Sequence, residues 1–224
     1  ENTGDHETLE ELEPVCWRQI ELLKEAFAGD MLDVEKAGNI FIDWNFDLDK
    51  QACGQAIWIY ALKDMIRIEK VLGHDTKNLA DDVQAKTKAA LSLLDEKTGL
   101  FVSGSDRQVS YASQLWMILA GVVTAEQGRQ ILRKLDHYEN AVKLNSPYAY
   151  HHYIQALIDA GMKEEAYRRM HEYWDGMIRE GSDTFWEIYN PLDPDMSPYG
   201  GLAVHSFCHA WSCTPAYFLR KYFY

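Results

Sequence analysis

Two short segments of this chain carry residue types suited to acid–base chemistry on a sugar. Glu187 stands among aromatic and branched residues in the segment 184–190, and His209 follows about twenty residues later in the segment 206–212. A carboxylate among rings either has a hydrogen-bond partner or has its pKa raised by desolvation, which suits a general base. Sugars stack apolar faces on rings and need fixed polar partners. These segments favour a carbohydrate site, and the competing interpretation is an exposed Glu187 at a helix start.

The composition restricts the classes of function. The chain has 224 residues, of which 47% are hydrophobic and 12% aromatic, and its net charge is −13. This length and composition predict one globular domain over residues 1–224. The negative charge, without a basic cluster, argues against a nucleic-acid partner. No run of eighteen apolar residues is present, so we expect no membrane span.

The cysteines give no sign of a metal centre. Cys16, Cys53, Cys208 and Cys213 are far apart except for the last two, which flank His209 with a spacing unlike common zinc motifs. We therefore expect buried free thiols. The sequence predicts neither a metal site nor a cofactor.

Apolar residues recur at helical spacing along most of the chain, which predicts an all-α fold. The expected helices cover about residues 14–28, 50–72, 76–94, 110–122, 124–137, 147–160, 163–179 and 202–222. The helix at 110–122 is apolar on all sides and should be interior, whereas 124–137 is amphipathic and should begin with a capping box of Thr124 and Gln127. In the first helix, a buried stripe is expected from Val15, Ile20, Leu22, Leu23 and Phe27.

Buried and exposed helices that alternate through short turns indicate stacked αα-hairpins. An open solenoid of hairpins should show a fixed sequence period, and none is found. We therefore expect an (α/α)₆-type toroid with inner and outer helices. Three long connections, at residues 30–49, 99–109 and 181–201, each lead into a proposed inner helix. These loops should gather at one end of the barrel and carry the site.

Four stretches together resemble the six-hairpin catalytic domain of bacterial α-L-rhamnosidases. They are Trp186-Glu187, Phe41-Ile42-Asp43-Trp44, the segment 206–217 reading SFCHAWSCTPAY and the segment 110–127 reading SYASQLWMILAGVVTAEQ. The resemblance covers most of the chain. It implies an inverting glycosidase that removes terminal α-L-rhamnose, in which one carboxylic acid protonates the leaving oxygen and one carboxylate activates water.

The resemblance also implies residue roles. Glu187 would be the general base, His209 would bind sugar hydroxyls, Trp44 would stack on the sugar and Trp186 would line the pocket. Asp43 is the best candidate for the acid within these residues, because its loop is predicted at the same barrel end; an N-cap or a solvated loop position is its competing interpretation. Tyr111, near the start of an inner helix, could also face the pocket or pack in the core.

The chain departs from the family pattern in one respect. The family's general acid belongs to an acidic segment upstream of the Asp43-Trp44 stretch, and that segment is not in this sequence. Eight helices are also fewer than six complete hairpins require. We therefore expect the C-terminal two-thirds of a catalytic domain, inactive alone if the acid is missing, from a secreted or periplasmic parent. A noncatalytic sugar-binding remnant and a helical-repeat interaction module remain alternatives.

Overall fold

The computed structural model describes residues 4–224, and its elements are mostly helical. The long helices are α1 (His6–Lys24), α3 (Gln51–Leu72), α4 (Lys77–Leu91), α5 (Tyr111–Leu119), α6 (Ala125–Asp136), α7 (Pro147–Asp159) and α8 (Lys163–Arg179). Shorter elements are β1 (Phe27–Ala28), β2 (Met31–Leu32), α2 (Val34–Ala37), η1 (Leu202–Val204), η2 (Ala210–Ser212), α9 (Thr214–Phe218) and the π-helical turn η3 (Leu219–Phe223). β1 and β2 form a small antiparallel hairpin in which Phe27 pairs with Leu32. No helix among residues 4–224 is long and apolar enough to cross a membrane.

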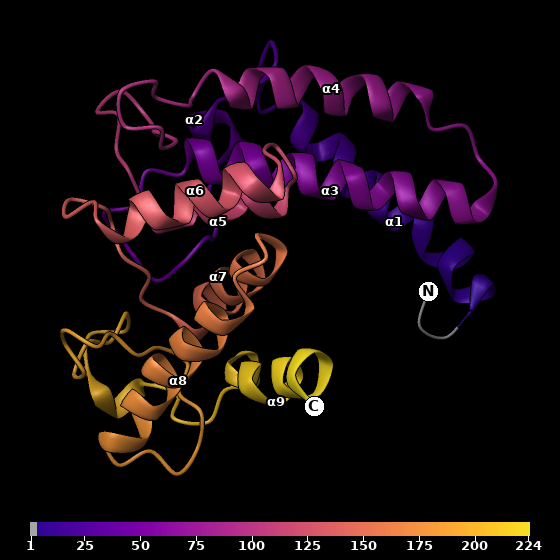
Figure 1. The fold of residues 1–224 in the computed structure, drawn as a ribbon. Coiled ribbons are helices and arrows are strands. Elements are labelled where there is room, and N and C mark those ends of the chain that lie inside the picture. The colour runs from indigo at the N-terminus through magenta and orange to yellow at the C-terminus, as the bar shows by residue number, and fades with distance from the viewer. Residues whose placement is uncertain (1–3) are drawn as a thin grey trace.

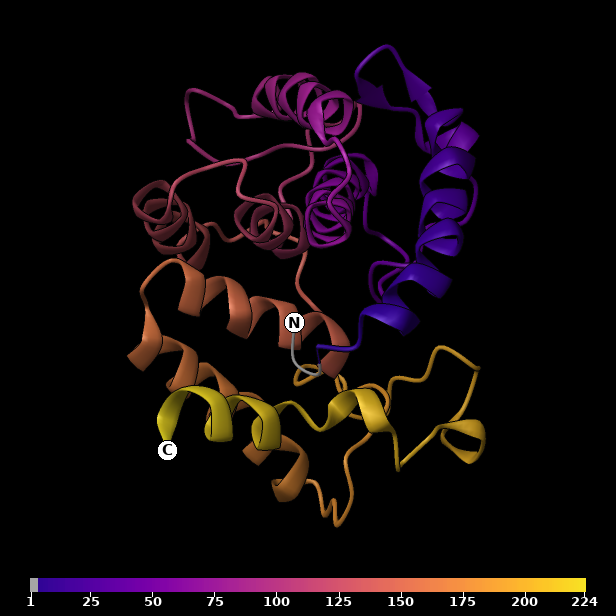
Figure 2. The ribbon, with the colours of Figure 1, turned by 90° about the vertical axis from the view of Figure 1, so that its right-hand side faces the viewer.

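The helices alternate between an inner and an outer position, as the apolar patterns predict. The helices α3, α5 and α7 contact one another in succession, while α4 lies against α3, α6 against α5 and α7, and α8 against α7. Figure 2 looks along several helices and shows α4 and α6 outside α3 and α5, and Figure 1 shows α7 and α8 side by side below them. The fold is thus an arc of αα-hairpins of the (α/α)₆ type.

Two predicted helices are confirmed in detail. Seven of the nine residues of α5 are buried, so this helix is interior. At the start of α6, the backbone N–H of Thr124 donates to Gln127 Oε1 at 2.9 Å, and the N–H of Gln127 donates to Thr124 Oγ1 at 3.3 Å. This reciprocal pair is the capping box, which satisfies two N–H groups that the helix itself leaves unpaired.

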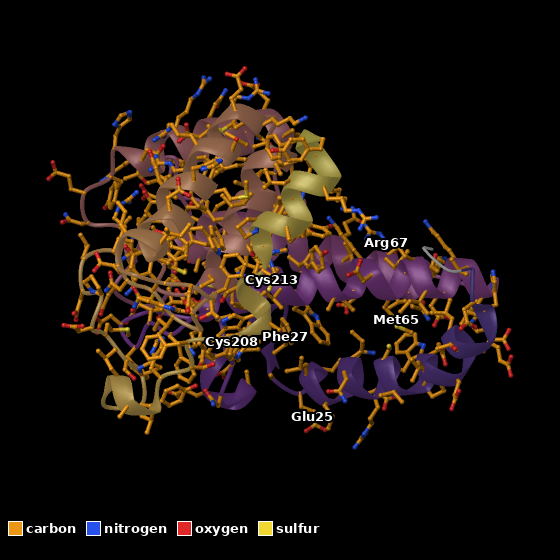
Figure 3. All side chains as sticks on the ribbon, turned by 90° about the horizontal axis from the view of Figure 1, so that it is seen from below. Glu25, Phe27, Met65, Arg67, Cys208 and Cys213 are labelled. Atoms are coloured by element: carbon orange, nitrogen blue, oxygen red, sulfur yellow. The ribbon has the colours of Figure 1, made fainter. Side chains whose placement is uncertain are left out.

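The buried stripe predicted for the first helix is wrong. Of its residues only Ile20 is buried in α1, while Val15, Leu22 and Leu23 are exposed. Phe27 is not helical and lies in β1. The reason is that α1 packs mainly on α3, through a small cluster around Ile20 and Met65, and a single neighbour covers only a narrow side of a helix. Figure 3 shows Phe27 and Met65 in the space between α1 and α3.

The last predicted helix, 202–222, is also wrong in its first half. Residues 202–213 form an irregular segment with the short turns η1 and η2, and the α-helix begins only at Thr214. The backbone makes other bonds here: the N–H of Glu187 donates to Ser206 O at 2.9 Å, and the N–H of His209 donates to Phe185 O at 2.8 Å. This segment is therefore tied to the chain around Glu187 instead of coiling on itself.

The prediction of four buried thiols holds for Cys53 alone. All four cysteines are free, but Cys16 is half-buried and Cys208 and Cys213 are exposed. The last two lie on the irregular segment, where Figure 3 labels them, and the lack of a helix explains their exposure. Burial raises the pKa of the Cys53 thiol to about 12, which keeps it protonated and unreactive.

The three long loops lie together, as predicted. Gln108 joins two of them, because its Oε1 accepts from the N–H of Asp49 at 2.8 Å and its Nε2 donates to Asp47 O at 2.7 Å. The indole of Trp44 then reaches the third loop at Glu187. One end of the helical arc is thus closed by loops from distant parts of the sequence.

Candidate active site

Glu187 is the centre of this loop cluster. Only 6% of its surface is exposed. Its Oε1 accepts a hydrogen bond from Tyr199 Oη at 2.5 Å and another from Trp44 Nε1 at 3.3 Å. Its backbone carbonyl accepts from Trp211 Nε1 at 2.9 Å. Aromatic side chains from three segments therefore hold Glu187, two through its carboxylate and one through its backbone carbonyl.

Trp44 provides the first of these rings, and its neighbours form a continuous aromatic patch. The Trp44 ring meets Phe41 edge-on at 5.2 Å and Tyr199 at 5.5 Å between centroids. Phe41 lies parallel to Trp211 at 6.0 Å, and Tyr148 packs against both Phe41 and Trp211. Tyr199 is 46% exposed and Phe41 is exposed as well, so this patch reaches the surface beside Glu187. Ring faces beside a held carboxylate are the surroundings that a sugar prefers.

Asp43 is as buried as Glu187, with 6% of its surface exposed, but its partners differ. Its Oδ1 accepts from Ser146 Oγ at 2.5 Å and from the N–H of Trp44 at 2.8 Å, and its Oδ2 accepts from the N–H of Asn145 at 2.7 Å. Asn145 in turn donates through Nδ2 to Trp44 O at 2.9 Å. These bonds attach the Trp44 loop to the start of α7, where Ser146 is also the N-cap.

Burial raises the pKa of Asp43 from 3.8 to about 6, and the hydrogen bonds from Ser146, Asn145 and Trp44 limit the rise. A raised pKa suits a proton donor. The surroundings do not, because three donors already point at the two oxygens and the carboxyl group has little contact with solvent. Asp43 is neither a solvated loop residue nor an N-cap; the structure places it as the anchor of Trp44.

His209 lies near Glu187 through Trp211. Its ring packs against the Trp211 ring with centroids 4.2 Å apart, and its Nδ1 accepts from the N–H of Trp211 at 3.4 Å. The side chain is half-buried and is not part of a helix, since His209 is the residue before the turn η2. Its other ring nitrogen, Nε2, has no described hydrogen-bond partner among residues 4–224.

Trp186 lies apart from the patch that surrounds Glu187. Its ring packs edge-on against Phe207 at 5.2 Å and Tyr189 at 6.1 Å, next to the main hydrophobic core. Its carbonyl accepts from Ser212 Oγ. In the described contacts Trp186 thus supports the backbone on which Glu187 is carried and does not join the rings of Trp44.

Tyr111 faces a different cavity from the one expected. It lines a cavity of ≈ 330 Å³ together with tyrosines of α7 and α8, and Lys143 lies over its ring at 4.5 Å. Its Oη donates to Asp136 at 3.5 Å, and burial raises its pKa to about 12. Glu187 is not among the residues that line this cavity. Tyr111 and Glu187 are therefore not brought together.

Tyr199 and Trp211, whose side chains donate hydrogen bonds to Glu187, were not predicted as site residues. Trp211 stands within the SFCHAWSCTPAY segment, so its position beside His209 was a usable signal. Tyr199 lies in the loop 181–201, an irregular stretch of chain without a periodic pattern. Phe41 belongs to the stretch Phe41-Ile42-Asp43-Trp44, which carries the family resemblance, so the sequence could have indicated this residue as well.

One group of side chains in residues 4–224 has the composition of a metal site. Carboxylate oxygens of Glu13 and Glu69 and a ring nitrogen of His74 lie within 4.8 Å of one another. Glu69 is buried, and it accepts from Trp17 Nε1 at 2.8 Å and contacts His74 Nδ1 at 2.8 Å. These partners already account for both of its oxygens. The group joins α1 to α3 far along the sequence from Glu187.

Comparisons with known proteins agree with this geometry. The profile of the bacterial alpha-L-rhamnosidase six-hairpin glycosidase domain matches residues 1–223. A rhamnosidase from Klebsiella oxytoca, solved with rhamnose bound, is 43% identical over 95% of this chain and 42% of its own, with a TM-score of 0.88. A comparison with curated proteins gives no match.

Two more distant structures show the same fold. A GH78 family rhamnosidase of Bacillus sp. GL1 is 22% identical, with a TM-score of 0.83 over 98% of this chain and 24% of its own. The Streptomyces avermitilis α-L-rhamnosidase, complexed with L-rhamnose, is 18% identical, with a TM-score of 0.69 over 96% of this chain and 21% of its own. The chain thus spans less than half the length of each of these relatives. Because the family profile matches nearly its whole length, the chain belongs to the bacterial α-L-rhamnosidase six-hairpin glycosidase domain family.

Proposed function

We propose that this chain supplies the general base of an inverting α-L-rhamnosidase, which hydrolyses terminal α-L-rhamnose from glycans. The observation that carries the proposal is the position of Glu187, a carboxylate held by Tyr199 and Trp44 beside an aromatic patch that reaches the surface. The similarity to a rhamnosidase with rhamnose bound, at 43% identity, supports the choice of sugar.

In the proposed reaction Glu187 takes a proton from a water molecule, whose oxygen attacks the anomeric carbon. The bond to the leaving oxygen breaks on the opposite face of the sugar, and a carboxylic acid there gives its proton to that oxygen. Attack from the face opposite the leaving group inverts the anomeric configuration. Such a pair of carboxyl groups stands roughly 6.5–9.5 Å apart, which leaves room for the water.

The other side chains have supporting roles in this proposal. Trp44 and Phe41 offer ring faces to the apolar side of rhamnose, and His209 binds a sugar hydroxyl through its outer ring nitrogen. The acid role of Asp43 remains a prediction. Its three donors favour a positioning role, in which Asp43 holds Trp44 and thereby Glu187 in place.

The test is hydrolysis of an aryl α-L-rhamnoside by the 224-residue chain, by Glu187→Gln and by the control Glu180→Gln, which changes an exposed glutamate. Rhamnose binding is followed by calorimetry in parallel. We expect turnover, because an aryl leaving group departs with little help from an acid. Glu187→Gln should abolish this turnover, and Glu180→Gln should leave it unchanged. Proton NMR should show β-L-rhamnose as the first product, because the reaction inverts.

Other outcomes separate the alternatives. Binding of rhamnose without turnover would indicate a sugar-binding chain that lacks an acid partner. Retention of the α configuration in the first product would exclude the proposed water attack. If the chain neither binds nor hydrolyses the sugar, an interaction module is the better interpretation.

A further inference from the structure

The cavity of ≈ 330 Å³ that Tyr111 lines is a second concave site of the molecule. Its walls come from the start of α5, from α7 and α8, and from the loop residues 190–192. The volume lies at the lower end of the roughly 300–1,000 Å³ of small-molecule sites, and rings with a few polar groups are a usual lining of such sites. The cavity therefore has the size and the lining for one small ligand.

Tyr153 of α7 is the most informative residue of this cavity. Only 3% of its surface is exposed. Its hydroxyl has no hydrogen-bond partner among residues 4–224, yet it is not one of the unpartnered atoms that the protein covers completely, which are nitrogens of Trp58, His152 and His205. The hydroxyl thus keeps an open side, and the open space that Tyr153 borders is this cavity. Because buried polar groups are nearly always paired, a polar group inside the cavity would supply the missing partner.

The free hydroxyls of the cavity can both donate and accept. Burial raises the pKa of Tyr153 and the pKa of Tyr150, so both phenols stay protonated at neutral pH. Tyr150 Oη, like Tyr153 Oη, makes no hydrogen bond within the described part of the chain, whereas Tyr173 Oη donates to Tyr189 O at 2.7 Å. A hydroxyl group on the ligand would match the two free phenols, because it too is both donor and acceptor.

The charges around the cavity are matched. Arg169 contacts Asp136 at 2.9 Å and Glu165 at 2.8 Å, and Glu172 lies 3.5 Å from it. Lys143 is exposed and lies over a tyrosine ring. An anion would have to displace the carboxylates that Arg169 already holds, and a cation would meet Arg169 and Lys143. Because a charge buried without a partner is costly, the lining favours an uncharged ligand.

Tyrosine rings form much of the apolar wall. Tyr111 and Tyr153 meet edge-on at 5.6 Å between ring centroids, and Tyr150 stacks on Tyr173 at 3.6 Å. Leu144 adds an aliphatic surface. Apolar C–H groups pack well against such rings. Hydroxyl groups, C–H faces and the lack of a charge are combined in a neutral sugar.

We propose that this cavity binds a neutral monosaccharide, one of whose hydroxyl groups forms a hydrogen bond with Tyr153 Oη. The site is independent of the hydrolysis proposed for Glu187, which does not line the cavity. The domain would thus hold a sugar at a place where no bond is broken.

The test is calorimetry of the 224-residue chain with D-glucose, D-galactose and D-mannose, which differ in the direction of single hydroxyl groups. L-Rhamnose is left out because it is the sugar proposed for Glu187. We expect at least one of the three to bind, with an affinity that added salt leaves unchanged. The uronate and the amino sugar that correspond to the tightest binder should bind at least about tenfold more weakly, since each adds an unmatched charge. Binding of none of the three, or equal or tighter binding of a charged counterpart, would overturn the proposal.

Tyr153→Phe locates the binding. It removes the hydroxyl and keeps the ring, and it should fold normally because that hydroxyl makes no bond within residues 4–224; urea unfolding checks this. The affinity for the sugar should fall about fivefold, as expected for the loss of one hydrogen bond between neutral groups. The control is Tyr60→Phe, which removes the hydroxyl of an exposed tyrosine outside the cavity. Unchanged affinity in Tyr153→Phe, or an equal loss in Tyr60→Phe, would place the sugar elsewhere and overturn the proposal.

The same measurement on Glu187→Gln separates the two sites. We expect this variant to bind the neutral sugar as tightly as wild type, because Glu187 is not part of the cavity wall. A loss comparable to that of Tyr153→Phe would place the sugar at the candidate active site and overturn the proposal. Since the readout is binding, the result stands whether or not Glu187 proves to be a base.

Discussion

Asp43 and Glu187 are equally buried carboxylates at the same end of the helical arc, but the chain surrounds them differently. Asp43 receives donors on both oxygens from the chain next to it and from the start of α7. Glu187 receives donors on Oε1 from two aromatic side chains, one of which is 46% exposed. The first carboxylate is built into the scaffold, whereas the second lies beneath groups that a ligand can reach.

This difference shows why burial alone does not identify a catalytic carboxylate. Backbone N–H groups at a helix start hold an acid for structural reasons, and such bonds are costly to break. Side-chain donors from loops can rearrange when a substrate arrives. The proposal therefore gives the chemistry to Glu187 and positioning to Asp43, and four substitutions test that distinction.

The largest effect is expected for Glu187→Gln. Loss of a general base lowers turnover by about 10²–10⁴-fold, while the amide oxygen can still accept from Tyr199 and Trp44. Turnover of an aryl rhamnoside should therefore fall without a change in the midpoint of urea unfolding. A large loss of stability in this variant would mean that Glu187, like Asp43, belongs to the scaffold.

Asp43→Asn should change stability and its pH dependence. Because burial raises the pKa of Asp43 from 3.8 to about 6, the folded chain binds this proton more tightly than the unfolded chain. The resulting stability is fully present below about pH 4 and is lost as the pH rises through 6, by about 3 kcal/mol in total. The difference in free energy of unfolding, wild type minus Asp43→Asn, should therefore fall by this amount as the pH rises.

Urea unfolding between pH 4 and 8 measures that difference, and Asp47→Asn in the same loop is the matched control, since Asp47 is exposed. Asp43→Asn should also be less stable than wild type near neutral pH. Its side-chain NH₂ group cannot accept a hydrogen bond from the N–H of Asn145 or Trp44. If Asp43→Asn instead abolishes turnover with unchanged stability, Asp43 is the acid after all.

Part of this site could be predicted from the sequence, and part could not. Glu187, Trp44 and His209 stand in motifs that carry the family resemblance, and the structure brings them into one loop cluster. Trp186 does not join them, because the segment is not helical and consecutive side chains there point to different sides. Tyr199 was beyond prediction, since its contact with Glu187 depends on the path of an irregular loop that contains no periodic pattern.

The fold, too, could be predicted from the sequence only in part. Strong local signals located α5 and α6, because their apolar pattern and capping box act within a few residues. The error at residues 202–213 arose because Trp211 bonds the Glu187 carbonyl and Phe207 packs on the Trp186 ring, and the local pattern does not encode such tertiary contacts. Pro215, in the first turn of α9, marked the true start of that helix.

Tyr199→Phe should have a smaller effect on turnover than Glu187→Gln. The bond from Tyr199 Oη to Glu187 is 2.5 Å long, and a bond to a charged acceptor contributes about 1.5–3 kcal/mol. We expect kcat to fall about tenfold, because the base loses its fixed orientation. Substitution of Tyr217, another exposed tyrosine, by Phe is the control. Equal kcat in wild type and Tyr199→Phe would show that this bond opens before the reaction.

Trp44→Phe should have the smallest effect. The ring is kept, and only the longer bond to Glu187, at 3.3 Å, is lost. We expect kcat to fall by about threefold with little change in KM, because a hydrogen bond of this length is weak and contributes little to the orientation of Glu187. Phe46→Ala changes an exposed ring beside Trp44 and should leave both constants unchanged. A rise in KM alone would indicate that the indole mainly contacts the sugar.

The bond between Trp44 and Glu187 joins residues 143 positions apart, and Tyr199 and Trp211 lie further toward the C-terminus. During synthesis, the hairpins from α3 to α8 can fold on the ribosome before these closing residues have been made. A nascent chain would then have its helical core but an unheld base. Proteolytic cleavage within the loop 190–204 would leave a mature chain in the same condition, so the proposed hydrolytic activity and the helical fold can be lost separately.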